Sequence, residues 1–190
     1  QMGGSDFVVE NGGQTVGLAR IRLPGAHNVR NALAALTVAM NLQIDFSPAC
    51  RALAGFGGVQ RRFQLIGEVG GVTVIDDYAH HPVEIAAVLG AARSIAPGQV
   101  IAVVQPHRYS RLRDLFEGFC TCFNDADAVV VADVYPAGEQ PLPGIDRDAL
   151  VEGLRSHGHR RVIRLPDAAA LAGVVGGIAR SGDLVVCLGA

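Results

Sequence analysis

Residues 100–134, "VIAVVQPHRYSRLRDLFEGFCTCFNDADAVVVADV", give the clearest indication of the fold class. Two apolar runs, 100–104 and 128–134, flank a segment, 111–125, whose apolar residues have helical spacing. Strands that are apolar throughout are typical of a parallel sheet that is covered on both faces. A strand, a helix and a second strand in this order also form the usual crossover unit of such a sheet. The stretch therefore predicts an α/β fold.

The same alternation continues on both sides of this stretch. Residues 62–69 and 72–76 flank Gly70-Gly71 and predict a hairpin, and a helix is expected to begin near Pro82. Further helices are predicted at 146–158 and 167–180, and further strands at 161–165 and 183–189. We expect residues 61–190 to form a mostly parallel sheet with helices on both faces, whose last strand is clipped.

The first 60 residues have a different pattern. Strand-like runs at 7–9 and 15–23 are joined by Asn-Gly-Gly, which suits a tight turn. A helix follows at 26–42, and Ser47-Pro48 predicts an N-cap and first helical residue for a short helix through Ala54. The glycine-rich segment "GFGGVQ" then marks a domain boundary. Residues 1–60 are predicted to be a separate hairpin-plus-helix unit.

Composition excludes several classes of protein. Charged residues make up 18% of the chain and the net charge is -2, so neither a nucleic-acid partner nor an anionic membrane surface is indicated. No apolar run approaches the roughly 20 residues that span a bilayer, and the start of the chain lacks a signal-peptide pattern. We expect a cytoplasmic protein, with its four cysteines as free thiols. All 16 basic residues are arginine, which excludes a lysine-containing P-loop within this chain.

Polar residues follow three of the predicted strands. These segments are "DDYAHHP" at 76–82, "QPHRYSR" at 105–111 and "DVYPAGE" at 133–139. Ligands of open α/β sheets bind outside the carboxyl ends of the strands, where such loops meet. We therefore expect the three loops to converge on one candidate site, with Asp133, Tyr135 and Glu139 at its rim.

The cluster "DDYAHHP" allows more than one role. Two histidines and a carboxylate could bind zinc, but neighbouring His80 and His81 diverge and no further ligand is close in sequence. A structural cluster that caps the next helix, or one wall of a site for a small charged ligand, also fits. The motif alone leaves these alternatives open.

Two arginine pairs suit anions. Arg108 and Arg111 lie three residues apart at a predicted strand-to-helix junction, where the helix N-terminus adds positive potential. This favours a carboxylate or phosphate site over a solvated face. Arg61 and Arg62 enter a predicted strand and should point to opposite faces, so that one could bind phosphate, or both could be solvated.

Asn28 and Asn31 fall on one face of a predicted helix. Their carboxamides could hydrogen-bond the edge of a base, because each offers a donor and an acceptor. The alternative is that His27 or Asn28 only caps the helix.

Taken together and in order, the motifs resemble those of the Mur ligases. They are "GAHNVRNALAA" (25–35), "GVQRRFQ" (58–64), "DDYAHHP", "QPHRYSR" and "DVYPAGE". The resemblance covers almost the whole chain. It implies that residues 1–60 are the end of the family's central ATPase domain and that 61–190 are its Rossmann-like C-terminal domain. The P-loop lysine and a carbamylated, magnesium-binding lysine are then expected upstream of residue 1.

The resemblance implies an ATP-dependent ligase of bacterial peptidoglycan precursor synthesis. It would join L-alanine to UDP-N-acetylmuramate through an acyl phosphate, with ATP and Mg²⁺, and this chain alone is expected to be inactive. The segment "PHRYSR" distinguishes the alanine-adding enzymes from the murein-peptide recycling ligase, which is kept as an alternative. We also keep two alternatives from other functional classes. One is a metal-dependent hydrolase built on Asp77, His80 and His81, and the other is a non-catalytic module that binds a nucleotide or an amino acid.

Site residues follow from the matching motif positions. For ATP, the resemblance implies that Asn28 and Asn31 contact adenine, Arg62 the phosphates and Asp77 the ribose region. Around L-alanine it implies Tyr78, His80, His107, Arg108 and Arg111, with the arginines on the carboxylate and His80 orienting the amine. Asp76 and His81 are expected to shape the loop. No general base and no metal ligand is assigned, and the sequence does not indicate an oligomeric state.

Overall fold

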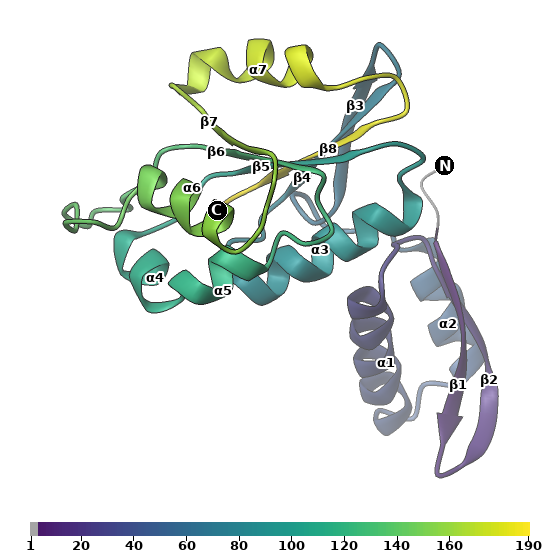
Figure 1. Cartoon of the computed structure of the whole chain (residues 1–190). Coiled ribbons are helices and arrows are strands. Elements are labelled where there is room, and N and C mark those ends of the chain that lie inside the picture. Colours follow the sequence, from purple (N-terminus) through teal and green to yellow (C-terminus); the bar gives the residue numbers. More distant parts are fainter. Residues whose placement is uncertain (1–3) are drawn as a thin grey trace. The chain divides into compact units, whose positions relative to one another are not determined.

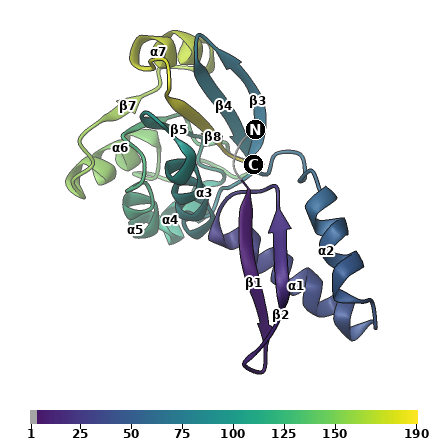
Figure 2. The same ribbon diagram turned by 90° about the vertical axis from the view of Figure 1, so that its right-hand side faces the viewer.

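The computed structural model describes residues 4–190. The chain divides into two compact units, Gln1–Val59 and Gln60–Ala190 (Figures 1 and 2). Each unit has its own apolar core. Over the described residues, no helix combines the length and the apolar character needed to cross a bilayer.

The first unit is an antiparallel hairpin with two helices. Strands β1 (Ser5–Asn11) and β2 (Gln14–Ile21) pair as predicted. Both glycines of the connection have positive φ, 58° and 80°, which explains the Asn-Gly-Gly sequence there. Helices α1 (Ala26–Asn41) and α2 (Phe46–Gly55) bury apolar residues with the hairpin. Val9, Ala19, Leu36 and Ala49 form the central cluster of its core.

The first helix of this unit begins at Ala26, as predicted, but the predicted start of the second helix is wrong. Helix α1 has Gly25 as its N-cap, with φ 98°, and neither His27 nor Asn28 caps it. Helix α2 begins at Phe46 with Asp45 as its N-cap, so Ser47 lies inside the helix. Proline is tolerated throughout the first helical turn, because the N–H groups there have no intrahelical acceptor. Pro48 therefore did not mark the first helical residue.

The second unit contains a six-stranded sheet in the order β3-β4-β8-β5-β6-β7. Only β3 is antiparallel to its neighbour, which confirms the prediction of a mostly parallel sheet. β8 is the last strand in the sequence, yet it lies between β4 and β5 in the sheet. The strand bounds are β3 Gln64–Val69, β4 Val72–Asp77, β5 Val100–Val104, β6 Ala128–Val131, β7 Val162–Arg164 and β8 Leu184–Leu188.

Helices cover both faces of this sheet, as predicted (Figure 1). Helix α7 (Leu171–Ile178), which follows a 3-10 turn at Ala168–Ala170, packs on one face. Helices α3 (Pro82–Ile95), α5 (Phe116–Thr121) and α6 (Arg147–Ser156) cover the other face. All five residues of β5 are buried, because the strand contacts helices on both sides.

The single helix predicted at 111–125 is instead two short helices. Helix α4 spans Tyr109–Asp114 and α5 begins at Phe116. Leu115 between them has φ −119°, outside the helical range, so the backbone turns there and a new helix starts. One continuous helix and two short helices have the same spacing of apolar residues, so the sequence pattern could not predict the break at Leu115.

The cysteines are free thiols, which confirms the prediction made from their spacing. Cys120 and Cys122 are buried, and burial is the main reason that their pKa values rise to about 11 and about 12. Both thiols are therefore protonated and unreactive at neutral pH.

Candidate functional site

The loops that follow β4, β5 and β6 lie at one edge of the sheet, because these strands are parallel. Backbone hydrogen bonds continue past the strand ends, from Gly189 N–H to the Asp77 carbonyl and from Gln105 N–H to the Leu188 carbonyl. His107 and Tyr135 form a further isolated bridge between the second and third loops. The predicted convergence of the polar loops is thus confirmed.

Four rings from these loops form a continuous row. The ring centroids of Tyr78 and His80 lie 5.2 Å apart, those of His80 and His107 6.0 Å, and those of His107 and Tyr135 5.4 Å. His107 stacks on Tyr135 with an interplanar angle of 21°. We call these four residues the ring row. It places the histidines of two different loops beside each other across the end of β8.

Two arginines lie over the Tyr78 end of the ring row. The guanidinium carbons of Arg61 and Arg62 are 5.1 Å and 5.7 Å from the centroid of Tyr78. The prediction that these neighbours point to opposite faces of a strand is therefore wrong. They precede β3, and positive φ values at Arg61 (55°) and Phe63 (50°) break the alternation of an extended chain. Arg61 also pairs with Asp76 at 3.1 Å.

Asp77 joins this arginine turn to the ring row. Its buried carboxylate accepts hydrogen bonds from the N–H groups of Phe63 and Ala79, both at 2.7 Å. Tyr78 N–H donates to the Arg61 carbonyl at 2.7 Å. Asp77 thus has a clear structural role in holding Arg62 and Tyr78 in place. Its contact with a nucleotide remains a prediction.

The two adjacent histidines have different tasks. His81 is the N-cap of α3, and its Nδ1 accepts from Val83 N–H at 3.3 Å. The Glu84 carboxylate completes the capping box by accepting from the N–H groups of His80 and His81. The structural alternative is therefore confirmed for His81. Among residues 4–190, no three His, Cys, Asp or Glu side chains form a group that could hold a metal ion.

His80 is held in one tautomer by its backbone. Its Nδ1 lies 2.9 Å from the Tyr78 carbonyl oxygen. A carbonyl can only accept a hydrogen bond, so Nδ1 carries the proton in the neutral ring. Nε2 is then left with its lone pair and can accept a proton or a hydrogen bond.

His107 is held in the opposite tautomer. A guanidinium nitrogen of Arg111 lies 3.2 Å from His107 Nδ1 and 3.1 Å from the His107 carbonyl oxygen. Guanidinium can only donate, so Nδ1 is the acceptor and the neutral ring carries its proton on Nε2. Burial first, and then the positive charge of Arg111, lower the pKa of His107 below its ordinary value.

The arginine loop, residues 105–111, differs in one respect from the expected anion site. The Ser110 N–H at the start of α4 donates to the Glu139 carboxylate at 2.9 Å, and the Ser110 hydroxyl donates at 2.5 Å. An internal carboxylate therefore occupies the helix N-terminus that we expected a ligand to use. Anion binding by the guanidiniums of Arg108 and Arg111 remains a prediction. Arg108 is exposed, and its φ of 74° is unusual for a residue other than glycine.

The two asparagines belong to the first unit. Asn28 is half-buried, and its side-chain N–H donates to the Pro24 carbonyl at 2.8 Å. The acceptor of this side chain is the carboxamide oxygen, which is not part of that hydrogen bond. Asn31 is exposed on the same helix. Their contact with adenine remains a prediction.

Comparison with known proteins gives the family. Residues 61–190 match the family model described as "Mur ligase, glutamate ligase domain". The chain belongs to this family. It is 62% identical over 194 residues to a UDP-N-acetylmuramate–L-alanine ligase of Rhodopseudomonas palustris strain TIE-1, an alignment that covers 99% of this chain and 42% of the relative. A ligase of the same name from Bradyrhizobium sp. strain BTAi1 is 68% identical over 168 residues, covering 88% and 36%.

Solved structures of Mur ligases have the same fold. The UDP-N-acetylmuramate-alanine ligase MurC of Thermotoga maritima superposes with a TM-score of 0.81 at 28% identity, over 99% of this chain and 40% of that one. The murein peptide ligase of Psychrobacter arcticus gives 0.61 at 25% identity, over 100% and 39%. The chain thus spans about two-fifths of the length of the Mur ligases that it matches.

Some residues of this Mur ligase site were missed by sequence reasoning or given only a place in a loop. Glu84 was missed, although His81 and Glu84 in "HHPVE" have the spacing of a capping box. Tyr135 and Glu139 were expected only at the rim, and their contacts with His107 and Ser110 have no sequence signal because they join different loops. The position of Arg61 over Tyr78 depends on backbone angles that no motif specifies.

Proposed function

We propose that this chain supplies the amino-acid site and part of the ATP site of a ligase that joins L-alanine to UDP-N-acetylmuramate in peptidoglycan precursor synthesis. One observation carries the proposal. Two guanidiniums lie beside two histidines of opposite tautomer at the carboxyl edge of the sheet, in a chain 62% identical to enzymes of that name. An α-amino acid needs such a combination, because it presents an anion and an amine on one carbon.

The carboxylate of the amino acid is assigned to the arginine loop. Arg108 and Arg111 supply the positive charge, and the planar guanidinium matches the two oxygens of a carboxylate. His107 adds the Nε2–H donor that its tautomer leaves available. Because the lowered pKa keeps the His107 ring neutral, it contributes a hydrogen bond without a further charge.

The amine is assigned to the other end of the ring row. His80 presents an Nε2 lone pair, which can accept a hydrogen bond from the amine. This hydrogen bond would orient the lone pair of the amine nitrogen for attack on the acyl phosphate. The exposed ring of Tyr78, 38% accessible, forms the adjacent wall. We assign these residues to binding and orientation, and we name no general base.

The proposed reaction has two steps. ATP phosphorylates the lactyl carboxylate of the sugar nucleotide, and the amine of L-alanine then attacks the acyl phosphate, which releases phosphate as the amide forms. Arg62, next to Tyr78, is assigned to the ATP phosphates and Asp77 to the ribose region, with Asn28 and Asn31 on adenine. The main Mg²⁺ ligands are assigned to parts of the enzyme that precede this chain. Such an enzyme would work in the bacterial cytoplasm.

The test uses a full-length ligase that contains this chain. Phosphate release from ATP should require both UDP-N-acetylmuramate and L-alanine, whereas the 190-residue chain alone should release none. Replacing L-alanine by the tripeptide that a murein peptide ligase uses should abolish the reaction. Activity with the tripeptide but not with L-alanine would assign the chain to the recycling enzyme instead. Phosphate release that does not depend on any amino acid or peptide would refute the proposal.

A further inference from the structure

The arginine loop is held by the loop that follows β6, which we call the Glu139 loop (residues 133–146). Tyr135 N–H donates to the Pro106 carbonyl and Arg108 N–H donates to the Tyr135 carbonyl, both at 2.8 Å. Ser110 lies two residues after Arg108. Its N–H and its hydroxyl both donate to the Glu139 carboxylate. The Glu139 loop therefore fixes the arginine loop at every second residue from 106 to 110.

The Glu139 loop is itself firmly anchored. Arg147, only 8% exposed, pairs with Asp133 at 2.9 Å and donates to the Leu165 carbonyl at 2.6 Å. Near the other contact, Glu139 N–H closes a turn onto the Pro136 carbonyl at 3.0 Å. The loop can thus act as a support for the arginine loop rather than as a flexible rim.

The arginine loop needs such a support. Arg108 has φ 74° and ψ 132°, a conformation that persists only where surrounding contacts impose it. Helix α4, which follows, has only six residues and cannot hold the turn through its own hydrogen bonds. The contacts from Tyr135 and Glu139 lie on either side of Arg108 in sequence and oppose relaxation of the strained turn.

We infer that Glu139 is a positioning residue of the amino-acid site, which holds the turn from Arg108 to Arg111 in the conformation that binds the substrate carboxylate. This inference rests on the proposed function. Both Glu139 oxygens are already engaged by Ser110, and a negative charge would repel a bound carboxylate, so direct substrate contact is not its role. The guanidiniums of Arg108 and Arg111 and the carboxylate of Glu139 together carry a net charge of +1. This charge balances the single negative charge of one α-carboxylate.

Positioning and simple electrostatics predict opposite results for Glu139→Gln. Removing the negative charge strengthens the positive field of Arg108 and Arg111, so electrostatics alone predicts a lower KM for L-alanine. Loss of a charge-assisted acceptor frees the turn, so positioning predicts a higher KM. In a full-length ligase that contains this chain, we expect Glu139→Gln to raise the KM for L-alanine several-fold and Glu139→Ala about tenfold. The KM for ATP should change less than about twofold.

Matched variants separate positioning from general damage. Glu152→Gln, an exposed glutamate on α6 paired with Arg155, should leave both KM values unchanged. Ser110→Ala should raise the KM for L-alanine less than Glu139→Ala does, and the double variant should be no worse than Glu139→Ala, because both changes remove one interaction. An unchanged or lowered KM for L-alanine in Glu139→Gln would overturn the inference, as would an equal rise in both KM values.

Hydrogen exchange gives a measurement that does not depend on activity. In Glu139→Gln, the amide of Ser110 loses its charged acceptor, so peptides covering residues 105–112 should exchange faster than in Glu152→Gln. Equal exchange in the two variants would refute the contact between the loops even if the enzyme proved to have another substrate. Faster exchange together with no reaction of L-alanine in the unmodified enzyme would refute the proposed function and leave the contact established.

Discussion

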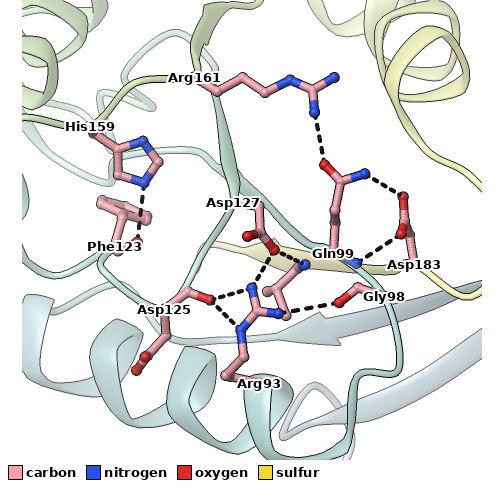
Figure 3. A network of polar contacts seen from close by, with 10 residues as sticks. Arg93, Gly98, Gln99, Phe123, Asp125, Asp127, His159, Arg161 and Asp183 are labelled. Carbon is pink, nitrogen blue, oxygen red and sulfur yellow. Dashed lines mark hydrogen bonds and ion pairs between the residues drawn. The ribbon is translucent and has the colours of Figure 1, made fainter.

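The two edges of the sheet in the second unit are built in different ways. At the amino ends of β5, β6 and β8, carboxylates and arginines are joined into one network of hydrogen bonds and ion pairs (Figure 3). At the carboxyl ends, the rings and arginines are exposed or half-buried, and several residues have strained backbone angles. The comparison shows where one sheet places its stabilising contacts and where it places its binding groups.

The amino edge satisfies its backbone groups with side chains. Asp183, 4% exposed, accepts from the N–H groups of Gln99 and Arg180, both at 2.8 Å. Asp127 accepts from Val100 N–H at 2.8 Å and pairs with Arg93. These bonds hold the starts of the strands together. Loss of either carboxylate leaves partly buried N–H donors without acceptors.

The carboxyl edge carries conformational strain instead. Arg61, Phe63, Arg108 and Ala137 all have φ between 50° and 74°, although none of them is glycine. Such residues cost about 1–3 kcal/mol each and tend to occur where a binding site is shaped. The strain is offset by contacts such as those of Asp77 and Glu139, and the amino edge has no counterpart to it.

The largest effect on stability is expected from Asp183→Ala at the amino edge. The change leaves two partly buried N–H groups without acceptors, so the free energy of unfolding should fall by about 3 kcal/mol. Denaturant unfolding followed by circular dichroism measures this. Asp114→Ala serves as the control, because Asp114 is exposed and pairs with its neighbour Arg113, and it should unfold like the unmodified chain. Similar losses in the two variants would remove the distinction between the edges.

At the carboxyl edge, Arg111→Ala should affect binding far more than folding. It removes one of the two guanidiniums assigned to the substrate carboxylate, so in a full-length ligase the KM for L-alanine should rise about 10- to 100-fold. The KM for ATP should change much less. Arg113→Ala, two residues away and exposed, is the matched control and should leave both values unchanged. A larger rise in the KM for ATP than for L-alanine would contradict the assignment of the arginine loop.

The two edges also differ in how much of their structure could be predicted from the sequence. Buried apolar runs such as "VIAVV" and "AVVV" predicted the parallel sheet, because only a doubly covered strand is apolar throughout. The position of "DDYAHHP" and "QPHRYSR" after strands then placed the candidate site at the carboxyl edge. The amino-edge network was not predicted, since Asp127 and Asp183 are single carboxylates before strands and belong to no motif.

Within the site, the sequence predicted which residue types come together but not how they are held. The opposite tautomers of His80 and His107 depend on which acceptor or donor faces each Nδ1, and that follows only from the folded backbone. The turn at Arg61 and the break at Leu115 were missed for a related reason. Backbone angles at single residues are set by tertiary contacts rather than by local side-chain pattern.

Two substitutions of Arg108 separate strain from charge. Arg108→Gly removes the guanidinium and relieves the backbone, because glycine adopts positive φ freely, so the chain should become more stable by about 1 kcal/mol. Arg108→Ala removes the same guanidinium and keeps the strain, so its stability should be close to that of the unmodified chain. Both variants should bind L-alanine more weakly in the full-length ligase. Equal stability of the two would show that the turn is not strained.

The smallest effects concern protonation within the ring row. Because burial and the neighbouring positive charges lower the pKa of His107 below its ordinary value of 6.5, the folded state binds its proton less readily than the unfolded state does. The resulting contribution to stability is full above about pH 6.5 and is lost as the pH falls through the folded-state pKa. Proton–nitrogen correlation NMR of the chain should show this titration below pH 6.5.

The same spectra report the tautomers. In the neutral rings we expect the proton on Nε2 of His107 and on Nδ1 of His80, because Arg111 donates to one ring and the Tyr78 carbonyl accepts from the other. In Arg111→Ala the pKa of His107 should rise only part of the way back, since burial is the larger cause of its shift. His157, exposed at the C-terminal end of α6 and paired with Glu117, should have a pKa above its ordinary value and serves as the internal reference. One common tautomer for His80 and His107 would remove the donor and acceptor pair on which the orientation of the amino acid depends.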